Sequence, residues 1–350
     1  MEAIRIDASY GSGGGQILRN SLALSSLLRK PVRIYNIRAK RPKPGLRRQH
    51  LTAVKLAKTI TNAKVNGMFL NSRTLYFEPR RIEDCSIAAN IGSAGSVFLA
   101  LQSVMLPALF ANLQIKLFGG TDVPFATPSA FFSDVFLREV NSIGARFEFE
   151  LVKRGYYPKG NGLVKFNSKK INRKLKPIEV LERGSLQYIK CVAHCASLPK
   201  EIADTLARTA KNYLLRKIDT DWHQEVVVDP NKETSGMGLD LIAFFEHSVL
   251  AVNVLGRKGN NAEQLAIKAA KQLIAKLNSE IVYDEHLADQ ILYFLVLANG
   301  TSRIQTRITK HILSNIWLIK KFITEAEIEI NKIDGEFGII EIKGISFKQS

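Results

Sequence analysis

One of the six histidines in this chain, His311, has surroundings that suit nucleophilic chemistry. It stands in TRITKHILSNIW, where the apolar spacing predicts the first turn of a helix. The positive end of a helix dipole favours the neutral imidazole, which is the form that can attack phosphorus. On residue type alone, however, a structural histidine is the simpler interpretation. The chain shows neither a Ser-His-Asp arrangement nor an H-E-x-x-H motif.

Acidic and amide side chains open a second predicted helix in the segment DEHLADQ. Glu285, Asp289 and Gln290 could belong to a site that the preceding turn faces. They could equally be residues that cap the helix. The sequence leaves both interpretations open.

A glycine-rich turn precedes the first predicted helix, at residues 11–15 (GSGGG). Glycine lets the backbone approach a ligand closely, and a helix N-terminus offers free N–H groups to anions. Gln16 occupies the position of the last glycine in a dinucleotide fingerprint, and no G-x-x-x-x-G-K-[ST] motif occurs. The turn is therefore either a cradle for phosphate or a tight turn that merely packs closely.

A basic loop follows the first helix and the strand after it. From Arg29 to His50 the chain has nine lysines and arginines and no acid. Pro42 and Pro44 stiffen this loop, and arginine suits a bidentate grip on phosphate. We predict phosphate contacts here, with a solvated basic surface as the alternative. The predicted RNA and phosphate contacts are Gly13, Gly14, Arg19, Arg38, Arg41 and Gln49.

The overall charge agrees with a polyanionic partner. The 350 residues carry a net charge of +18, and the pI is about 9.8. Excess positive charge favours nucleic acid and speeds encounter with it. The longest apolar windows are too short to span a bilayer, and the N-terminus has no apolar signal region. We expect a cytoplasmic protein without a membrane partner.

The three cysteines argue against a secreted disulfide framework. Cys191, His194 and Cys195 suggest part of a metal site at first. However, Cys191 and Cys195 alternate with other residues along an apparent strand, so both sulfurs should face one core. No second pair of ligands stands at a suitable spacing. We therefore predict a buried strand at this position.

A strand-helix-strand-helix-strand-strand pattern positions these candidates. It occurs at residues 4–78 and again at 85–166. A third copy is split, with its first strand at 177–181 and its first helix at 285–298. Periodicity predicts helices at 16–28, 47–60, 97–110, 130–143, 200–215, 262–277, 285–298 and 310–323.

The residues that split the third copy have strands and helices of their own. An inserted domain is the simplest account, because insertions enter at exposed loops. We predict an α/β (α+β) fold of three βαβαββ repeats. The repeat-built domain would cover 1–185 plus 281–350, and the inserted domain 186–280.

Seven segments across almost the whole chain resemble the RNA 3′-terminal phosphate cyclase family. They keep the order of the family and are specific together, although GSAGS or GGTD alone would be weak. The segments are GSGGGQILR (11–19), IRAKRPKPGLRRQHL (37–51), IGSAGS (91–96), GGTDVP (119–124), RGYYPKGNG (154–162), EHLADQ (285–290) and HILSN (311–315).

The resemblance implies an enzyme that uses ATP to convert an RNA 3′-phosphate end to a 2′,3′-cyclic phosphate. His311 matches the family's nucleophile, so it would become adenylylated and pass AMP to the RNA 3′-phosphate. The neighbouring 2′-hydroxyl would then attack that phosphorus and expel AMP. The implied cofactors are ATP and a divalent cation, Mg²⁺ or Mn²⁺. The implied ATP contacts are Gln102, Pro128, His286, Leu287, Ala288, Asp289 and Gln290.

The resemblance also implies the arrangement of the repeats. They would resemble the C-terminal domain of a translation initiation factor, set about a pseudo-three-fold axis, and the inserted domain would have thioredoxin-like topology. Two positions depart from the family. Ser12 stands where a metal-associated glutamate is frequent, which leaves the metal ligands unknown. His286 stands at an aromatic position but could still stack on adenine.

Two other functions stay open on the sequence. A non-catalytic relative would bind pre-ribosomal RNA and assist ribosome assembly, but such relatives lack the nucleophilic histidine. An enolpyruvyl transferase would share related repeats, but the inserted domain and the HILSN segment disfavour it. Neither the natural RNA nor the oligomeric state follows from the sequence.

Overall fold

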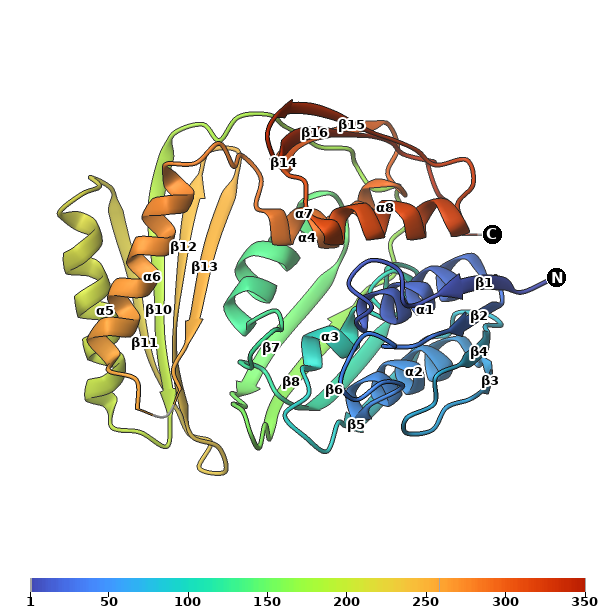
Figure 1. Ribbon diagram of the computed structural model, residues 1–350, viewed down its shortest axis with the longest axis horizontal. Helices are drawn as coiled ribbons and strands as arrows, with labels where there is room; N and C mark the ends of the chain where they lie inside the picture. The colour runs from blue at the N-terminus through green and yellow to red at the C-terminus, as the bar shows by residue number, and fades with distance from the viewer. Residues whose placement is uncertain (1, 258, 350) are drawn as a thin grey trace.

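The computed structural model describes residues 2–257 and 259–349 and shows a mixed α/β protein (Figure 1). The strands are β1 (Ile4–Asp7), β2 (Val32–Tyr35), β3 (Lys64–Asn66), β4 (Leu75–Glu78), β5 (Cys85–Asn90), β6 (Leu113–Gly119), β7 (Phe147–Lys153), β8 (Gly162–Ser168), β9 (Glu179–Val180), β10 (Leu186–Ala196), β11 (Asp221–Asp229), β12 (Gly236–Phe245), β13 (Val249–Leu255), β14 (Thr301–Arg307), β15 (Glu327–Asp334) and β16 (Phe337–Lys343).

Helices alternate with these strands. They are α1 (Gln16–Leu28), α2 (Arg48–Thr61), α3 (Val97–Leu101), η1 (Pro107–Phe110), η2 (Phe131–Leu137), α4 (Arg138–Ser142), α5 (Lys200–Leu215), α6 (Ala262–Leu277), α7 (Glu285–Leu295) and α8 (Lys310–Phe322). Among the residues described, no helix has both the length and the apolar character needed to cross a membrane.

Three of the sheets have the same strand order. The orders are β1-β2-β4-β3, β5-β6-β8-β7 and β9-β14-β16-β15. In each sheet the first two strands are parallel and the remaining pairs are antiparallel. The parallel pair needs a crossover, and in the first two sheets a helix lies between those strands in the chain. In the third sheet the crossover between β9 and β14 contains the whole of residues 186–280.

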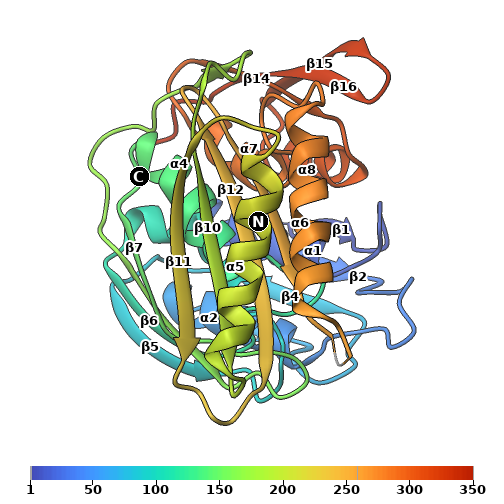
Figure 2. The same cartoon turned by 90° about the vertical axis from the view of Figure 1, so that its left-hand side faces the viewer.

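The interrupting residues form the fourth sheet, in the order β11-β10-β12-β13. Helices α5 and α6 lie side by side on one face of it (Figure 2). Their apolar faces and the strands enclose a separate core within residues 189–273. On the opposite face, Ile242, Phe244 and Ala251 join the larger core of the repeats. The inserted sheet is thus packed on both faces.

The cysteines lie where the alternation predicts. Cys191 and Cys195 are fully buried in the smaller core, on the face that α5 and α6 cover. Burial raises the pKa of the Cys191 thiol to about 12, which keeps it protonated at neutral pH. His194, one position away in the strand alternation, faces the repeats instead and contacts Tyr156.

Two predicted helices differ from the structure in their course. The helix expected at 97–110 is interrupted, because α3 ends at Leu101 and η1 starts at Pro107, where proline suits a first turn. The helix expected at 130–143 begins as the π-helix η2 and continues as α4. Phe131 and Phe136 of this wider segment both line the cleft described next.

Candidate active site

A cleft of about 1340 Å³ runs between the three sheets of like strand order, called the repeats here, and the segment 186–280 that was predicted as an inserted domain and keeps that name below. Its repeat wall comes from α1, α3, the loop 123–128, α7 and the start of α8. Its other wall comes from β13, the loop after it and α6. This volume exceeds the 300–1,000 Å³ of an ordinary small-molecule pocket, so the cleft has room for more than one mononucleotide.

The glycine turn lies against the helix that carries His311. Gly11 and Gly13 have φ of +61° and +57°, which L side chains adopt only with strain. A Cβ on Gly11 would lie 2.2 Å from Oγ of Ser314 on α8. The glycines are therefore needed for a tight left-handed turn that packs on the third repeat.

An amide and guanidinium chain connects the three repeats beneath the cleft. Arg19 Nε donates to Gln102 Oε1 at 3.0 Å, and Gln102 Nε2 donates to Gln290 Oε1 at 3.3 Å. Burial lowers the pKa of Arg19 to about 10, although the charge of Asp289 raises it, so the guanidinium stays charged at pH 7. All three side chains line the cleft.

Asn315 on α8 is the second junction between repeats. Its Oδ1 accepts hydrogen bonds from Gln16 at 2.6 Å and from the Tyr293 hydroxyl at 2.7 Å. Its Nδ2 donates to the main-chain oxygen of Asp289 at 2.5 Å. Because Asn315 is fully buried, these bonds fix α8 relative to α1 and α7.

His311 and Asp289 face each other across this junction. His311 is the second residue of α8, which Thr309 caps by accepting from Ile312 N. Its Nδ1 lies 3.9 Å from Oδ2 of Asp289, and about half of the imidazole is exposed to the cleft. The pKa of His311 is lowered by desolvation and then by the nearby His286, Arg19 and Arg41. The neutral imidazole is therefore favoured at pH 7.

Asp289 is the one acid among the described residues that line the cleft, and its pKa is raised. Desolvation raises its pKa to about 7, while His286 and Arg19 act in the opposite direction. The carboxyl therefore titrates close to neutral pH instead of near pH 4. A perturbed carboxyl next to a neutral histidine in a cleft is a typical catalytic arrangement.

His50 packs against the glycine turn at Gly15. It is buried, and its Nδ1 accepts from the main-chain N of Arg47 at 3.2 Å. A Cβ on Gly15 would lie 2.3 Å from its Nε2. Desolvation, and then the charges of Arg19, Arg38 and Arg47, lower the pKa of His50 to about 3. The ring therefore stays neutral throughout the physiological range.

The basic loop divides into residues that face the cleft and residues that hold the loop. Arg41 lines the cleft, and its Nη2 would lie 3.1 Å from a Cβ on Gly14. Arg38 instead turns back, since its Nη1 donates to the main-chain oxygens of Lys43 and Gly45 at 2.5 and 3.1 Å. Arg41 thus presents its charge to the cleft, whereas Arg38 stabilises the conformation of the loop.

Several predicted contacts lie outside the cleft lining. Gln49 accepts from Ser96 N at 2.8 Å and so joins the first repeat to the second. Leu287 and Ala288 are buried in the core with their side chains, so only their backbones could touch a ligand. Gly13 and Gly14 are likewise buried beneath the basic loop. The structure does bring together Arg19, Arg41, Gln102, Pro128, His286, Asp289, Gln290 and His311.

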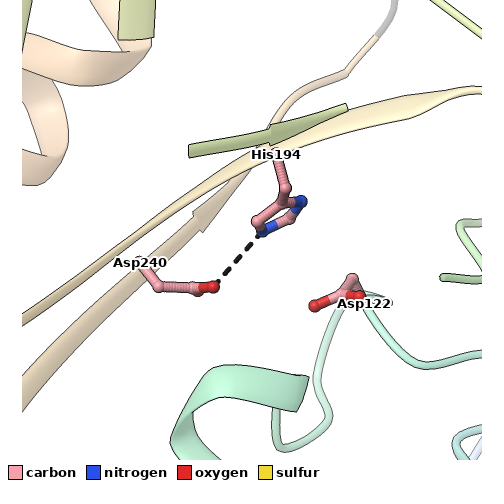
Figure 3. Close-up of side chains that lie close together, drawn as sticks. All are labelled: Asp122, His194 and Asp240. Atoms are coloured by element: carbon pink, nitrogen blue, oxygen red, sulfur yellow. Dashed lines mark ion pairs between the residues drawn. The ribbon is translucent and has the colours of Figure 1, made fainter. Parts of the chain in front are cut away.

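A buried cluster elsewhere has the composition of a metal site (Figure 3). One ligand atom each from Asp122, His194 and Asp240 lies within 4.8 Å of the others. However, Asp122 Oδ2 is paired with Arg154 Nη1 at 3.0 Å, and this charge lowers the pKa of Asp122 to about 2 despite its burial. Its oxygens also accept from Thr121 and Ser129.

The oxygens of the Asp122 carboxylate are therefore already bound by the Arg154 guanidinium and by the hydroxyls of Thr121 and Ser129. His194 Nε2 lies 3.3 Å from Asp240 Oδ2, and its Nδ1 lies 2.6 Å from the Tyr156 hydroxyl. The cluster thus joins the inserted domain to residues of the second repeat. We interpret it as a polar contact between domains and not as a metal centre.

Two features of the cleft were not predicted from the sequence. One is Phe125, because the segment that resembles the family ends at residue 124. The other is the wall from the inserted domain, which includes Arg257, Gln264 and Lys268. The signals were an aromatic residue in a proline-flanked loop and a basic, amide-rich helix start, both of which also occur on ordinary surfaces.

Comparison with known proteins gives a consistent result. The profile of the family described as RNA 3′-terminal phosphate cyclase matches residues 10–330. Proteins named RNA 3′-terminal phosphate cyclase are similar over nearly their full length. The one from Staphylothermus marinus is 39% identical over 99% of each chain, and the one from Desulfurococcus amylolyticus is 38% identical over 99% of this chain and all of that one.

A third relative of the same name, from Sulfurisphaera tokodaii, is 42% identical over 91% of this chain and 94% of its own. Among solved structures, the enolpyruvyl transferase NikO from Streptomyces tendae matches with a TM-score of 0.39 and 13% identity. It covers 97% of this chain and 48% of that one. A likeness this weak carries no argument about fold or function.

Proposed function

This chain belongs to the RNA 3′-terminal phosphate cyclase family, and we propose that it converts an RNA 3′-phosphate end to a 2′,3′-cyclic phosphate in an ATP-dependent reaction. The observation that carries this proposal is the pairing of neutral, half-exposed His311 with Asp289 in a basic cleft. A nucleophile, its polar partner and the countercharge for phosphates thus lie in one place.

His311 would act as the nucleophile of the first step. Since Nδ1 faces Asp289, Nε2 is left to attack the α-phosphorus of ATP. The new N–P bond replaces the bond to pyrophosphate, which leaves. The imidazole becomes positively charged in this step, and the Asp289 carboxylate would stabilise that charge and hold the ring in orientation. The product is an enzyme-histidyl-AMP intermediate.

The RNA end would then take over the AMP. An oxygen of the RNA 3′-phosphate attacks the AMP phosphorus and breaks the N–P bond, so His311 returns to its neutral form. The neighbouring 2′-hydroxyl attacks the activated 3′-phosphorus, loses its proton and expels AMP. Ring closure is intramolecular and needs positioning more than a strong base.

The residues of the cleft fit an ATP molecule chemically. Arg19 offers charge to the ATP phosphates, while Gln102 and Gln290 offer amide donors and acceptors. His286 is exposed to the cleft and Pro128 lines it, so either can cover a base. Arg41 would hold the RNA 3′-phosphate beside it.

A divalent cation would neutralise the phosphate charges when it is bound with ATP. The cleft gives it few carboxylates, since Asp289 is the one acid among the described residues that line it. Ser12, exposed in the glycine turn, has no carboxylate to offer. Phosphate oxygens and water would therefore supply most of the metal's ligands in this protein.

The alternative is a non-catalytic relative that binds RNA in ribosome assembly. The basic charge supports that function equally well. His311 beside Asp289 distinguishes the two, because RNA binding alone needs neither a half-exposed nucleophile nor a carboxyl with a raised pKa.

Labelling with radioactive ATP tests the proposal. The pure protein, incubated with α-³²P-ATP and Mg²⁺, should acquire an acid-labile label, and His311→Ala should acquire none. His247→Ala is the matched control, since His247 is exposed on the inserted domain and away from the cleft lining, and it should label normally. A wild-type protein that binds RNA without any label would support the non-catalytic alternative.

A further inference from the structure

Phe125 is the most exposed large apolar side chain among the described residues, at 99% of its full accessibility. It also has a φ of +62°, a left-handed conformation that is rare and strained for a bulky residue. With Pro124 it forms a turn, in a position where glycine or asparagine is usual. Both the exposed apolar ring and the strained backbone destabilise the folded state. A functional role for the ring would explain why this position has phenylalanine.

The loop that carries Phe125 is closed at its base by hydrogen bonds to Asp122, one of the residues labelled in Figure 3. Ser129, at the far end, donates through Oγ to Asp122 Oδ1 at 2.9 Å. Arg154 Nη1 holds both ends, because it lies 3.0 Å from Asp122 Oδ2 and 2.7 Å from Ser129 Oγ. The loop tip is therefore presented from a fixed base, which lowers the entropy lost when a ligand binds it.

The tip faces the same cleft as the nucleophile. Phe125 lines the cleft together with Arg41 and His311. The inserted domain contributes Arg257, Gln264 and Lys268, all of them exposed. The described lining holds one acid, Asp289, against Arg19, Arg41, Arg257 and Lys268, while Lys276 is already paired with Asp284 and Glu285. This charge suits a polynucleotide backbone, and an exposed aromatic ring beside it suits a base.

We propose that Phe125 is the stacking platform for a base at the 3′ end of the RNA, and that Arg257 and Lys268 of the inserted domain hold the backbone that leads to it. This inference rests on the proposed function, which places the RNA 3′-phosphate near His311. It gives the inserted domain a function as one wall of the RNA path.

RNA is favoured over the adenine of ATP by the layout of the cleft. The side chains implied for ATP are tied together through Arg19, Gln102 and Gln290. Phe125 is almost fully exposed, so it packs against none of them. The cleft also exceeds the size that one nucleotide needs. A second binding position is therefore available for the ring.

Fluorescence of a labelled RNA tests the stacking directly. A short RNA with 2-aminopurine as its last base and a 3′-phosphate is titrated with the full-length protein without ATP. Stacking on Phe125 should quench the fluorophore. Phe125→Ala should lose most of the quenching and bind about 5- to 160-fold more weakly, the range for losing one base–aromatic stack. Phe125→Trp should restore both.

Two variants separate stacking from other effects. Phe125→Gly removes the ring and also the backbone strain, so it should bind as weakly as Phe125→Ala while unfolding at no lower a temperature than the wild type. Phe69→Ala removes another exposed phenyl, at 63% exposure and outside the cleft lining, and should bind like the wild type. Arg257→Ala and Lys268→Ala should each weaken binding and reduce its dependence on salt.

Each outcome decides between the two proposals. If Phe125→Ala binds RNA normally while the wild type forms the histidyl label, the platform is wrong and the cyclase function stands. If Phe125→Ala loses the label as strongly as RNA binding, the ring stacks on ATP and the platform for RNA is wrong. If the wild type never acquires the label, and Phe125→Ala quenches the RNA less than the wild type does, the platform stands and the cyclase function falls.

Discussion

His311 Nδ1 lies 3.9 Å from Asp289 Oδ2, and the two groups shift their pKa values in opposite directions. The pKa of His311 is lowered from its usual value near 6.5, and the pKa of Asp289 is raised to about 7. Desolvation is the largest cause in both cases. Near pH 7, therefore, Asp289 changes from a protonated, uncharged acid to a carboxylate. Only the carboxylate can stabilise a positively charged His311.

This relationship predicts the pH dependence of adenylylation. The lowered pKa of His311 favours its neutral form at pH 7 and above, so the rate there should follow the ionisation of Asp289. It should fall about tenfold per pH unit below pH 7 and be constant above it. Single-turnover labelling between pH 5.5 and 9 measures this. Asp289→Asn should be slower by on the order of tenfold at pH 8, and its rate should be flat near pH 7. The same inflection in the variant would assign it to another group.

Arg41 should act on the RNA and not on the first step. It lines the cleft from the basic loop, while Arg48, the first residue of α2, donates to the main-chain oxygen of Gly92 and lies outside the lining. Arg41→Ala should weaken binding of the 3′-phosphate RNA about tenfold and reduce the salt slope by about 0.7, the value for one phosphate contact with a single strand. Adenylylation should change less than threefold.

Binding titrations at several salt concentrations, together with the labelling assay, measure both effects. Arg48→Ala is the control and should leave the salt slope unchanged. Equal loss of labelling and of RNA binding in Arg41→Ala would place this side chain on the ATP phosphates instead.

Ser12 should determine how strongly the protein depends on the divalent cation. Its side chain is exposed in the glycine turn. Ser12→Glu would add a carboxylate there, and hard cations prefer carboxylate oxygens. The Mg²⁺ concentration for half-maximal labelling should fall several-fold. Ser12→Gln, of similar size without charge, should not lower it. An unchanged requirement in both variants would mean that this position does not reach the metal.

His50 should make the protein less stable in acid. Its pKa is about 3 in the folded state and near 6.5 when unfolded. Between these values the unfolded chain binds more protons, so the free energy of unfolding falls as the pH drops from 6.5 towards 3. Near the lower end of that window each pH unit costs up to about 1.4 kcal/mol. Asp289 acts in the opposite direction between pH 4 and 7, which reduces the net slope.

Denaturant unfolding at pH 7, 6 and 5 measures this contribution. His50→Gln should lose less stability across the series than the wild type does, whatever its stability at pH 7. A wild-type and variant pair with parallel pH profiles would show that the His50 pKa is not depressed.

The sequence alone determined the local order of the protein. The glycine turn at 11–15, the spacing of apolar residues in α1 and α6, and the alternation around Cys191 and Cys195 each follow from neighbours in the chain. Local rules of conformation and burial act on such short windows, so helices and strands and the repeated pattern could be predicted. The segments shared with the cyclase family identified His311 as the residue of interest.

Only the tertiary structure decided which side chains meet. Arg19, Gln102 and Gln290 come from three different repeats, and no spacing along the chain places them in one hydrogen-bonded chain. Among the basic residues, Arg41 faces the cleft while Arg38 braces its own loop. The pKa of Asp289 depends on desolvation by elements that are distant in the sequence. Phe125 is exposed because no other part of the fold covers it. Contacts and burial are properties of the folded chain, whereas the sequence sets only which groups are available.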